Sequence, residues 1–161
     1  MDVDEPLPDL AVRRTWEVPV PAAFPRRPIL VGSEIYRHSV YGRTHPLSIQ
    51  RVTPAVDLVR ALGWLQDDRY VDSPRATPEQ IARFHDPDYI AAVIEAERSR
   101  QVPVEVRERY NIGRNGNPVF AEIFRRPATS SGAALFAGKT LANVQRGVIH
   151  TPAGGTHHGR P

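Results

Sequence analysis

The chain has 161 residues, 40% of them hydrophobic and 24% charged, which gives it the size and apolar content of one folded domain. Its formal net charge of +3 gives no argument for nucleic-acid binding. The absence of cysteine excludes disulfide frameworks, thiolate metal sites and cysteine nucleophiles.

The first 27 residues are predicted to form an extended, proline-rich arm, because their prolines remove backbone donors and interrupt regular elements. We place the folded domain at residues 28–161. The opening MDVDEPLPDL lacks the basic-then-apolar order of a signal peptide, and no later apolar run approaches the roughly 20 residues of a membrane span. We therefore expect a cytoplasmic protein with no membrane partner.

The first part of the domain predicts one strand and one helix. The β-branched run at 29–31 predicts a buried strand that ends near Tyr36. Residues 37–51 have no clear period and are predicted to form a long ordered loop. Residues 53–63 predict a helix, since they open on Thr-Pro and close on a glycine.

Further helices are predicted in the second half. Thr-Pro-Glu-Gln at 77–80 is a capping-box pattern, and Asp-Pro at 86–87 opens another helix. The polar stretch 97–109 and the following RYNIGRNGNPVF are predicted to be connections. Residues 119–144 have a helical pattern that Pro127 must break or kink, and their small side chains are typical of a helix packed on a sheet.

A second buried strand is predicted at residues 147–150, and it runs directly into AGGTHHGRP. The order of a strand, several helices and a strand predicts an α/β fold. The strongest candidate for chemistry lies just past this strand, where open α/β sheets place their ligands. It is the motif Gly154-Gly155-Thr156-His157-His158.

This motif has two interpretations. Its glycines allow the backbone to approach a ligand, and its two imidazoles can act as acid and base near neutral pH. A polar C-terminal segment without a function explains the motif equally well. Adjacent imidazoles point in divergent directions, and the other histidines show no helical spacing, so the residues alone do not predict a metal site.

Two other patterns are weaker. Gly-Lys-Thr at 138–140 resembles the end of a phosphate-binding loop, but its spacing is wrong and it lies inside a predicted helix. Tyr41, His45 and Arg51 lie in the loop after the first strand, where they could line a pocket, and Arg51 could bind an anion. On residue type alone, hydrogen bonds from His45 and Arg51 to loop carbonyls are the simpler interpretation.

Four blocks in this order resemble the N-terminal part of the histone deacetylase superfamily, closest to the bacterial acetoin-utilisation-type deacetylases. Each block is weak, but the ordered set is specific, and it covers the chain from about Pro28 to its last residue. The blocks are YGRTHPLSIQR at 41–51, RATPEQIARFHDPDY at 75–89, RYNIG with NPVF at 109–120, and AGGTHH at 153–158.

This resemblance implies a three-layer α/β/α arginase/deacetylase-like fold around a parallel sheet, of which the chain would hold the N-terminal portion. It also implies zinc-dependent removal of acetyl groups from acetyl-lysine or small acetylated amines, in which zinc polarises the carbonyl and activates a water. The family's zinc ligands, two Asp and one His, lie downstream of the GG-x-HH block. The resemblance therefore assigns no metal ligand within these 161 residues.

The same resemblance assigns roles to the candidate residues. His158 would match the general base, and His157 would match its partner imidazole. The substrate-binding residues would be Tyr41, His45 and Arg51 in the wall of the channel behind the acetyl pocket, and Gly154 and Gly155 at the rim.

Three hypotheses follow. In the leading one, the chain is part of a zinc-dependent deacetylase and is inactive alone, because the zinc ligands are missing. In the second, it is a truncated, non-catalytic deacetylase-like fragment that acts as a binding or oligomerisation module, since an incomplete parallel sheet exposes an apolar edge. A homo-oligomer is compatible with this second hypothesis. The third, nucleic-acid binding, rests only on arginine content, and we expect no such partner.

Overall fold

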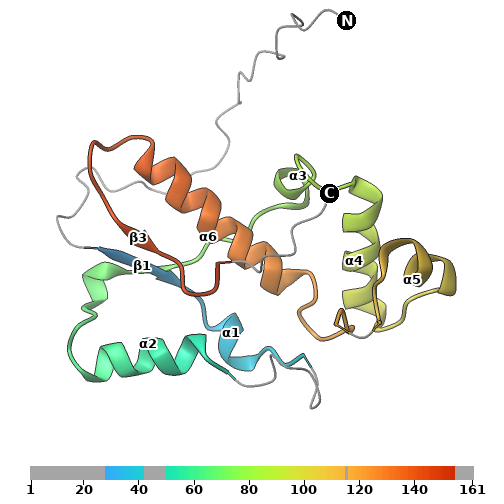
Figure 1. The fold of residues 1–161 in the computed structure, drawn as a ribbon, viewed down its shortest axis with the longest axis horizontal. Helices are drawn as coiled ribbons and strands as arrows, with labels where there is room; N and C mark the ends of the chain where they lie inside the picture. The colour runs from blue at the N-terminus through green and yellow to red at the C-terminus, as the bar shows by residue number, and fades with distance from the viewer. Residues whose placement is uncertain (1–27, 42–49, 115, 155–161) are drawn as a thin grey trace, which may run out of the picture.

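The computed structural model describes residues 28–41, 50–114 and 116–154 of the chain. Figure 1 shows the arrangement of their helices and strands. In chain order these are β1 (Ile29–Gly32), α1 (Ile35–His38), α2 (Val52–Ala61), β2 (Tyr70–Asp72), α3 (Pro78–Ile81), α4 (Pro87–Ser99), α5 (Val104–Tyr110), α6 (Arg125–Leu141) and β3 (Ile149–His150), with a 3-10 turn at Asp67–Arg69 before β2.

The three strands form a parallel sheet in the order β2-β1-β3. Leu30 of β1 is in register with Tyr70 of β2 on one side and with His150 of β3 on the other. Parallel neighbours need long crossover connections, and here α2 lies between β1 and β2, while α3 to α6 lie between β2 and β3. The carboxyl ends of all three strands therefore lie at the same edge of the sheet.

Helices cover both faces of this sheet, with α6 on one side and α2 on the other (Figure 1). Side chains alternate along a strand, so Ile29 and Val31 of β1 point to one face, where they pack against Ala133 and Phe136 of α6. All four side chains are buried. The arrangement confirms the predicted three-layer α/β/α fold class, with a parallel sheet between the helices.

A second hydrophobic cluster lies beside the sheet and is built from α4, α5 and the segment that leads into α6. Val93 and Ala96 of α4 pack there against Ile112 and Ile123, and all four are buried. Phe124 also packs on this cluster and immediately precedes α6. The helix α6 therefore starts on the second cluster and continues onto the sheet.

Most helix boundaries predicted from local signals are confirmed. The capping box of Thr77 and Gln80 is present with both reciprocal hydrogen bonds, and the carboxylate of Asp86 caps α4. Gly63, at a φ of +70°, follows the end of α2. The expected start of α2 is wrong by two residues, because its N-cap is Arg51 and Thr53 is buried inside the first turn. Within the described residues, no helix is both long and apolar enough to cross a membrane.

The predicted strand end near Tyr36 is wrong, because β1 stops at Gly32 and the chain turns into α1. The stretch 97–109 is not only a connection, since it contains the end of α4 and most of α5. The short strand β2 is absent from the sequence prediction. Its three residues pair with β1, so the sheet, and not a local hydrophobic pattern, defines it.

The predicted helix at 119–144 begins only at Arg125. Pro127 therefore lies in the first turn of α6 and neither breaks nor kinks the helix interior. The first N–H groups of a helix have no intrahelical partner, so a proline is tolerated there.

The helix α6 lies very close to the segment that follows β2. The backbone N–H of Ala76 donates to the carbonyl oxygen of Ala128 at 2.9 Å, which joins the two segments directly. A Cβ atom added at Gly132 would lie 1.9 Å from the carbonyl oxygen of Pro74. Such a distance is impossible between non-bonded atoms, so this approach requires glycine.

We expect the substitution Gly132→Ala to lower the free energy of unfolding by at least about 2 kcal/mol, because α6 must move away from the segment after β2. Urea unfolding of the protein measures this change. Gly138→Ala in the same helix is the control, since no atom lies within 4 Å of its added Cβ. It should stabilise the protein by about 0.5–1 kcal/mol through helix propensity. Equal effects of the two substitutions would contradict the close approach.

Candidate functional site

The segments that follow the three strands all reach the first half of α6. After β2, Ser73 Oγ donates to the carbonyl oxygen of Thr129 at 2.8 Å. After β3, Ser130 Oγ donates to the carbonyl oxygen of Ala153 at 2.6 Å. After β1, the contact is made through Arg126. This is the carboxyl edge of the sheet, where α/β folds place their ligands.

Arg126 organises the segment after β1. Its guanidinium carbon lies 4.5 Å from the ring centroid of Tyr41 and 5.5 Å from that of Tyr36. Its Nη1 donates to the carbonyl oxygen of Ser39 at 3.2 Å. The Tyr41 ring also lies 4.6 Å from the ring of Phe120, centroid to centroid. The predicted wall residue Tyr41 therefore contacts both a cation and an aromatic ring.

The local electrostatics keep Tyr36 neutral. Burial raises the pKa of Tyr36 to about 12, although the nearby charge of Arg126 acts in the opposite direction. Only 4% of Tyr36 is exposed, so its phenol does not ionise near neutral pH. Tyr36 therefore adds no negative charge beside the guanidinium of Arg126.

Glu97 of α4 fixes the point at which α6 begins. Its Oε2 accepts hydrogen bonds from the backbone N–H groups of Phe124 at 2.9 Å and Arg125 at 3.0 Å. Its Oε1 accepts one from Arg125 Nε at 2.6 Å. Burial alone would raise the pKa of Glu97, but these backbone donors and the guanidinium lower it below its ordinary value of 4.5. A carboxylate from another helix thus caps α6 and complements its dipole.

An ion pair links α1 to α2. Arg37 of α1 donates from both terminal nitrogens to the carboxylate of Asp57 in α2, at 2.8 Å each. Its Nε donates to Glu34 at 2.6 Å. These hydrogen bonds lower the pKa values of Glu34 and Asp57. The pair orients α1, which carries the chain from β1 towards Tyr41.

Gly154 closes a tight turn just after β3. Its N–H donates to the carbonyl oxygen of Thr151 at 3.0 Å. An added Cβ would lie 2.7 Å from Thr151 Oγ1, so this turn favours glycine. Together with the bond from Ser130 to Ala153, the turn holds residues 151–154 against α6, where the GGTHH motif begins.

The structure brings only some of the predicted site residues together. Tyr41 and Gly154 lie at the end of the segments that contact Arg126 and Ser130 of α6. Arg51 is exposed and stands at the N-cap of α2. The other predicted residues, His45, Gly155, His157 and His158, lie outside the described residues, and so does the arm 1–27.

Residues 28–41, 50–114 and 116–154 contain no cluster of three or more His, Asp or Glu side chains able to hold a metal ion. The described residues therefore do not fit a zinc ion.

Sequence reasoning missed the two α6 residues that matter most at this edge, Arg126 and Ser130. Arg126 lies in an Arg-Arg pair that is typical of a solvated surface, and Ser130 lies in a run of small residues. The only available signal was their spacing of four, which places both on one face of a helix. That face is visible only once the helix is known to begin at Arg125.

Comparison with protein families and curated proteins gives one consistent result. A model of the histone deacetylase domain matches residues 45–161. The chain is 29% identical over 134 residues to the acetoin utilization protein AcuC of Bacillus subtilis, covering 83% of this chain and 34% of that protein. It is 31% identical over 125 residues to histone deacetylase 9 of Arabidopsis thaliana, covering 76% of this chain and 29% of that protein.

Solved structures agree with these matches. An HDAC homologue complexed with SAHA superposes with a TM-score of 0.75 at 34% identity, covering 83% of this chain and 36% of that one. The HDAC homologue from Aquifex aeolicus gives a TM-score of 0.75 at 33% identity, with the same coverage of 83% and 36%. The chain spans about a third of the length of these relatives.

We expect Glu97→Gln to lower the free energy of unfolding by about 1 kcal/mol, because it removes the charged cap of α6 and the ion pair with Arg125. The folded-state pKa of Glu97 is lowered, so its stabilisation is fully present above pH 4.5 and is lost as the pH falls below this value. Unfolding free energies of both proteins, measured from pH 7 to pH 3, should therefore converge at the acid end.

Glu95→Gln is the control for this prediction. Glu95 lies on the same helix, but its carboxylate is exposed and forms an ion pair with the exposed side chain of Arg98. Its replacement should change stability little. A wild-type advantage over Glu97→Gln that grows on acidification would contradict the capping role.

Proposed function

The chain belongs to the histone deacetylase family, and from this premise we propose that its protein is a zinc-dependent deacetylase. The proposed reaction is the hydrolysis of the amide bond in acetyl-lysine or in a small acetylated amine. One solved relative was crystallised with SAHA, which supports a ligand site in this fold. The substrate, the zinc ion and the hydrolytic activity are proposals for this chain.

The observation that carries the proposal is the convergence of three segments on α6 at the carboxyl edge of the sheet. The segment after β1 holds Tyr41 through Arg126, and the segment after β3 is held by Ser130. The GGTHH motif continues directly from this second segment. The parallel pairing of β1 with β3 supports an origin of Tyr41 and of the segment that leads to the motif at one edge of the sheet.

Within this proposal His158 acts as the general base and His157 as its partner imidazole. A neutral imidazole is well suited to accept a proton from water near neutral pH. Tyr41, His45 and Arg51 would line the channel behind the acetyl group, and Gly154 and Gly155 would form its rim. The packing of Tyr41 against Arg126 and Phe120 supports a rigid wall at this place.

The proposed zinc would have to be held by residues other than the described ones, because those provide no cluster of ligands. Since the chain spans about a third of its relatives, we propose that the ligands are supplied by the rest of the domain. The 161 residues alone would then be inactive.

A non-catalytic binding or oligomerisation module is the second candidate, and exposed apolar side chains favour it. Trp64 is 76% exposed and Val148 is 58% exposed, and Leu58 and Leu62 of the α2 region are also exposed. Surfaces of this kind are typical of protein contacts. If the module is the function, the 161-residue polypeptide should form a defined oligomer in sizing chromatography. A cooperatively melting monomer would contradict it.

We expect the full-length protein to contain bound zinc and to hydrolyse an acetyl-lysine peptide or N-acetylputrescine. His158→Ala should reduce kcat by about 10²–10⁴-fold, the usual effect of losing a general base. Zinc content by mass spectrometry and release of acetate measure the two properties.

His38→Ala is the matched control, because His38 is exposed in α1 and lies outside the GGTHH motif. It should leave kcat unchanged. Wild-type activity of His158→Ala would overturn the assignment of the base. A full-length protein that neither binds zinc nor hydrolyses either substrate would overturn the proposed function itself.

A further inference from the structure

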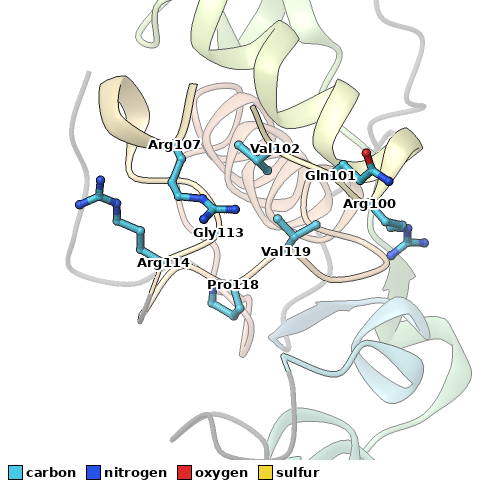
Figure 2. A pocket seen from close by; sticks show the side chains of 8 residues that line it. All are labelled: Arg100, Gln101, Val102, Arg107, Gly113, Arg114, Pro118 and Val119. Atoms are coloured by element: carbon cyan, nitrogen blue, oxygen red, sulfur yellow. The ribbon is translucent and has the colours of Figure 1, made fainter. Parts of the chain in front are cut away.

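A basic pocket of about 590 Å³ lies between the end of α4, α5 and the turn before Pro118. Three of its eight lining residues are arginines, and none is acidic. Figure 2 shows the side chain of Arg107 reaching across the pocket, with Arg114 and Arg100 on opposite sides of it. Val102 and Val119 lie between Arg107 and Arg100.

The positive charges of this pocket are not neutralised by the described part of the chain. No ion pair of Arg100, Arg107 or Arg114 is found there, and all three are exposed. Neighbouring arginines behave differently, since Arg98 pairs with Glu95 and Arg125 with Glu97. Three guanidinium groups without a carboxylate around one pocket produce a local positive potential.

Backbone turns fix the place of these arginines. Arg100 adopts a left-handed conformation, φ 61°, at the C-cap of α4. The turn that carries Arg114 is closed by two hydrogen bonds, from Asn117 N to the carbonyl oxygen of Arg114 at 2.9 Å and from Gly113 N to that of Asn117 at 2.8 Å. The arginines therefore project from defined points around the pocket.

The floor between the arginines is apolar and closely packed. An atom at the Cβ position of Gly113 would lie 3.6 Å from a methyl carbon of Val119, 3.7 Å from one of Val102 and 3.8 Å from Arg107 Nε. A guanidinium and two valines thus surround the same point. This combination suits a molecule that has both an anionic group and an apolar body.

We propose that this pocket is a binding site for a small organic anion, in which a carboxylate or phosphate contacts Arg107 and Arg114 and an apolar body packs on Val102 and Val119. The guanidinium fork provides paired donors for both anions. The site is independent of the proposed hydrolysis, because it requires none of the predicted catalytic residues.

The position of the pocket defines two sources for the anion. Val119 is followed by Phe120, whose ring packs on Tyr41, the predicted wall of the acetyl channel. The anionic group is therefore part of the acetylated substrate or belongs to a separate small molecule. The first alternative rests on the proposed function, whereas binding itself does not.

The test measures binding of benzoate to the full-length protein by isothermal titration calorimetry at low ionic strength. Inorganic phosphate probes the charge alone, and benzyl alcohol probes the apolar body alone. We expect benzoate to bind more tightly than either probe. The double variant Arg107→Gln/Arg114→Gln should weaken benzoate binding by about tenfold or more, because charge-assisted hydrogen bonds are lost.

Arg75→Gln/Arg83→Gln is the matched control, since it removes two exposed arginines outside the pocket and gives the same net charge. It should change benzoate binding less than twofold, by an electrostatic effect at a distance alone. Equal weakening in both double variants, no weakening in the pocket variant, or no binding by the wild-type protein would overturn the proposal. If the pocket double variant fails to fold, the single variants Arg114→Gln and Arg83→Gln provide the same comparison.

Kinetics then identify the source in a protein that binds benzoate at the pocket. Two results together assign the anion to the substrate. Benzoate inhibits competitively, and the Arg107→Gln/Arg114→Gln variant has a raised KM for acetylated substrates that carry a carboxylate. Binding without competition assigns it to a separate ligand. Both results support the site. Calorimetry measures binding without any enzymatic activity, so a failure of the proposed hydrolysis is distinguished from a failure of the binding site.

Discussion

The cap that Glu97 places on α6 is the interaction on which the contacts between α6 and the sheet edge depend. It fixes the residue at which α6 begins, because Oε2 accepts from the backbone N–H groups of Phe124 and Arg125. From that start, the helical repeat determines which α6 side chains face the sheet edge. A shift of one residue would turn Arg126 and Ser130 away from their partners.

The first half of α6 therefore acts as a common support for all three strands. It contacts the segment after β1 through Arg126, the segment after β2 through Thr129 and Ala128, and the segment after β3 through Ser130. The following turns of α6 pack on β1. Gly132 allows the backbone of α6 to approach the backbone of the segment after β2. The same helix thus builds the core and orients the loops in which α/β enzymes place their ligands.

Charge is distributed unevenly around this edge. Arg126 stacks on Tyr41 from one side, and its described contacts include no carboxylate. Beyond Phe120, three further arginines surround a pocket with no acidic lining residue. A surface of this kind favours anionic groups and disfavours cationic ones. The proposed anion site therefore rests on the electrostatics of this wall and not on the family.

The sequence by itself determined the α/β class, the central strand, the ends of several helices and the family, because these depend on local signals and on ordered motifs. Thr77 with Gln80, Asp86 and Gly63 act within their own turns, so their roles are visible in the sequence. Only the tertiary structure decided the strand β2, the start of α6 and the contacts of Arg126, Ser130 and the basic pocket. Each of these depends on residues brought together from distant parts of the chain, and the partner of an exposed arginine cannot be inferred from its neighbours in sequence.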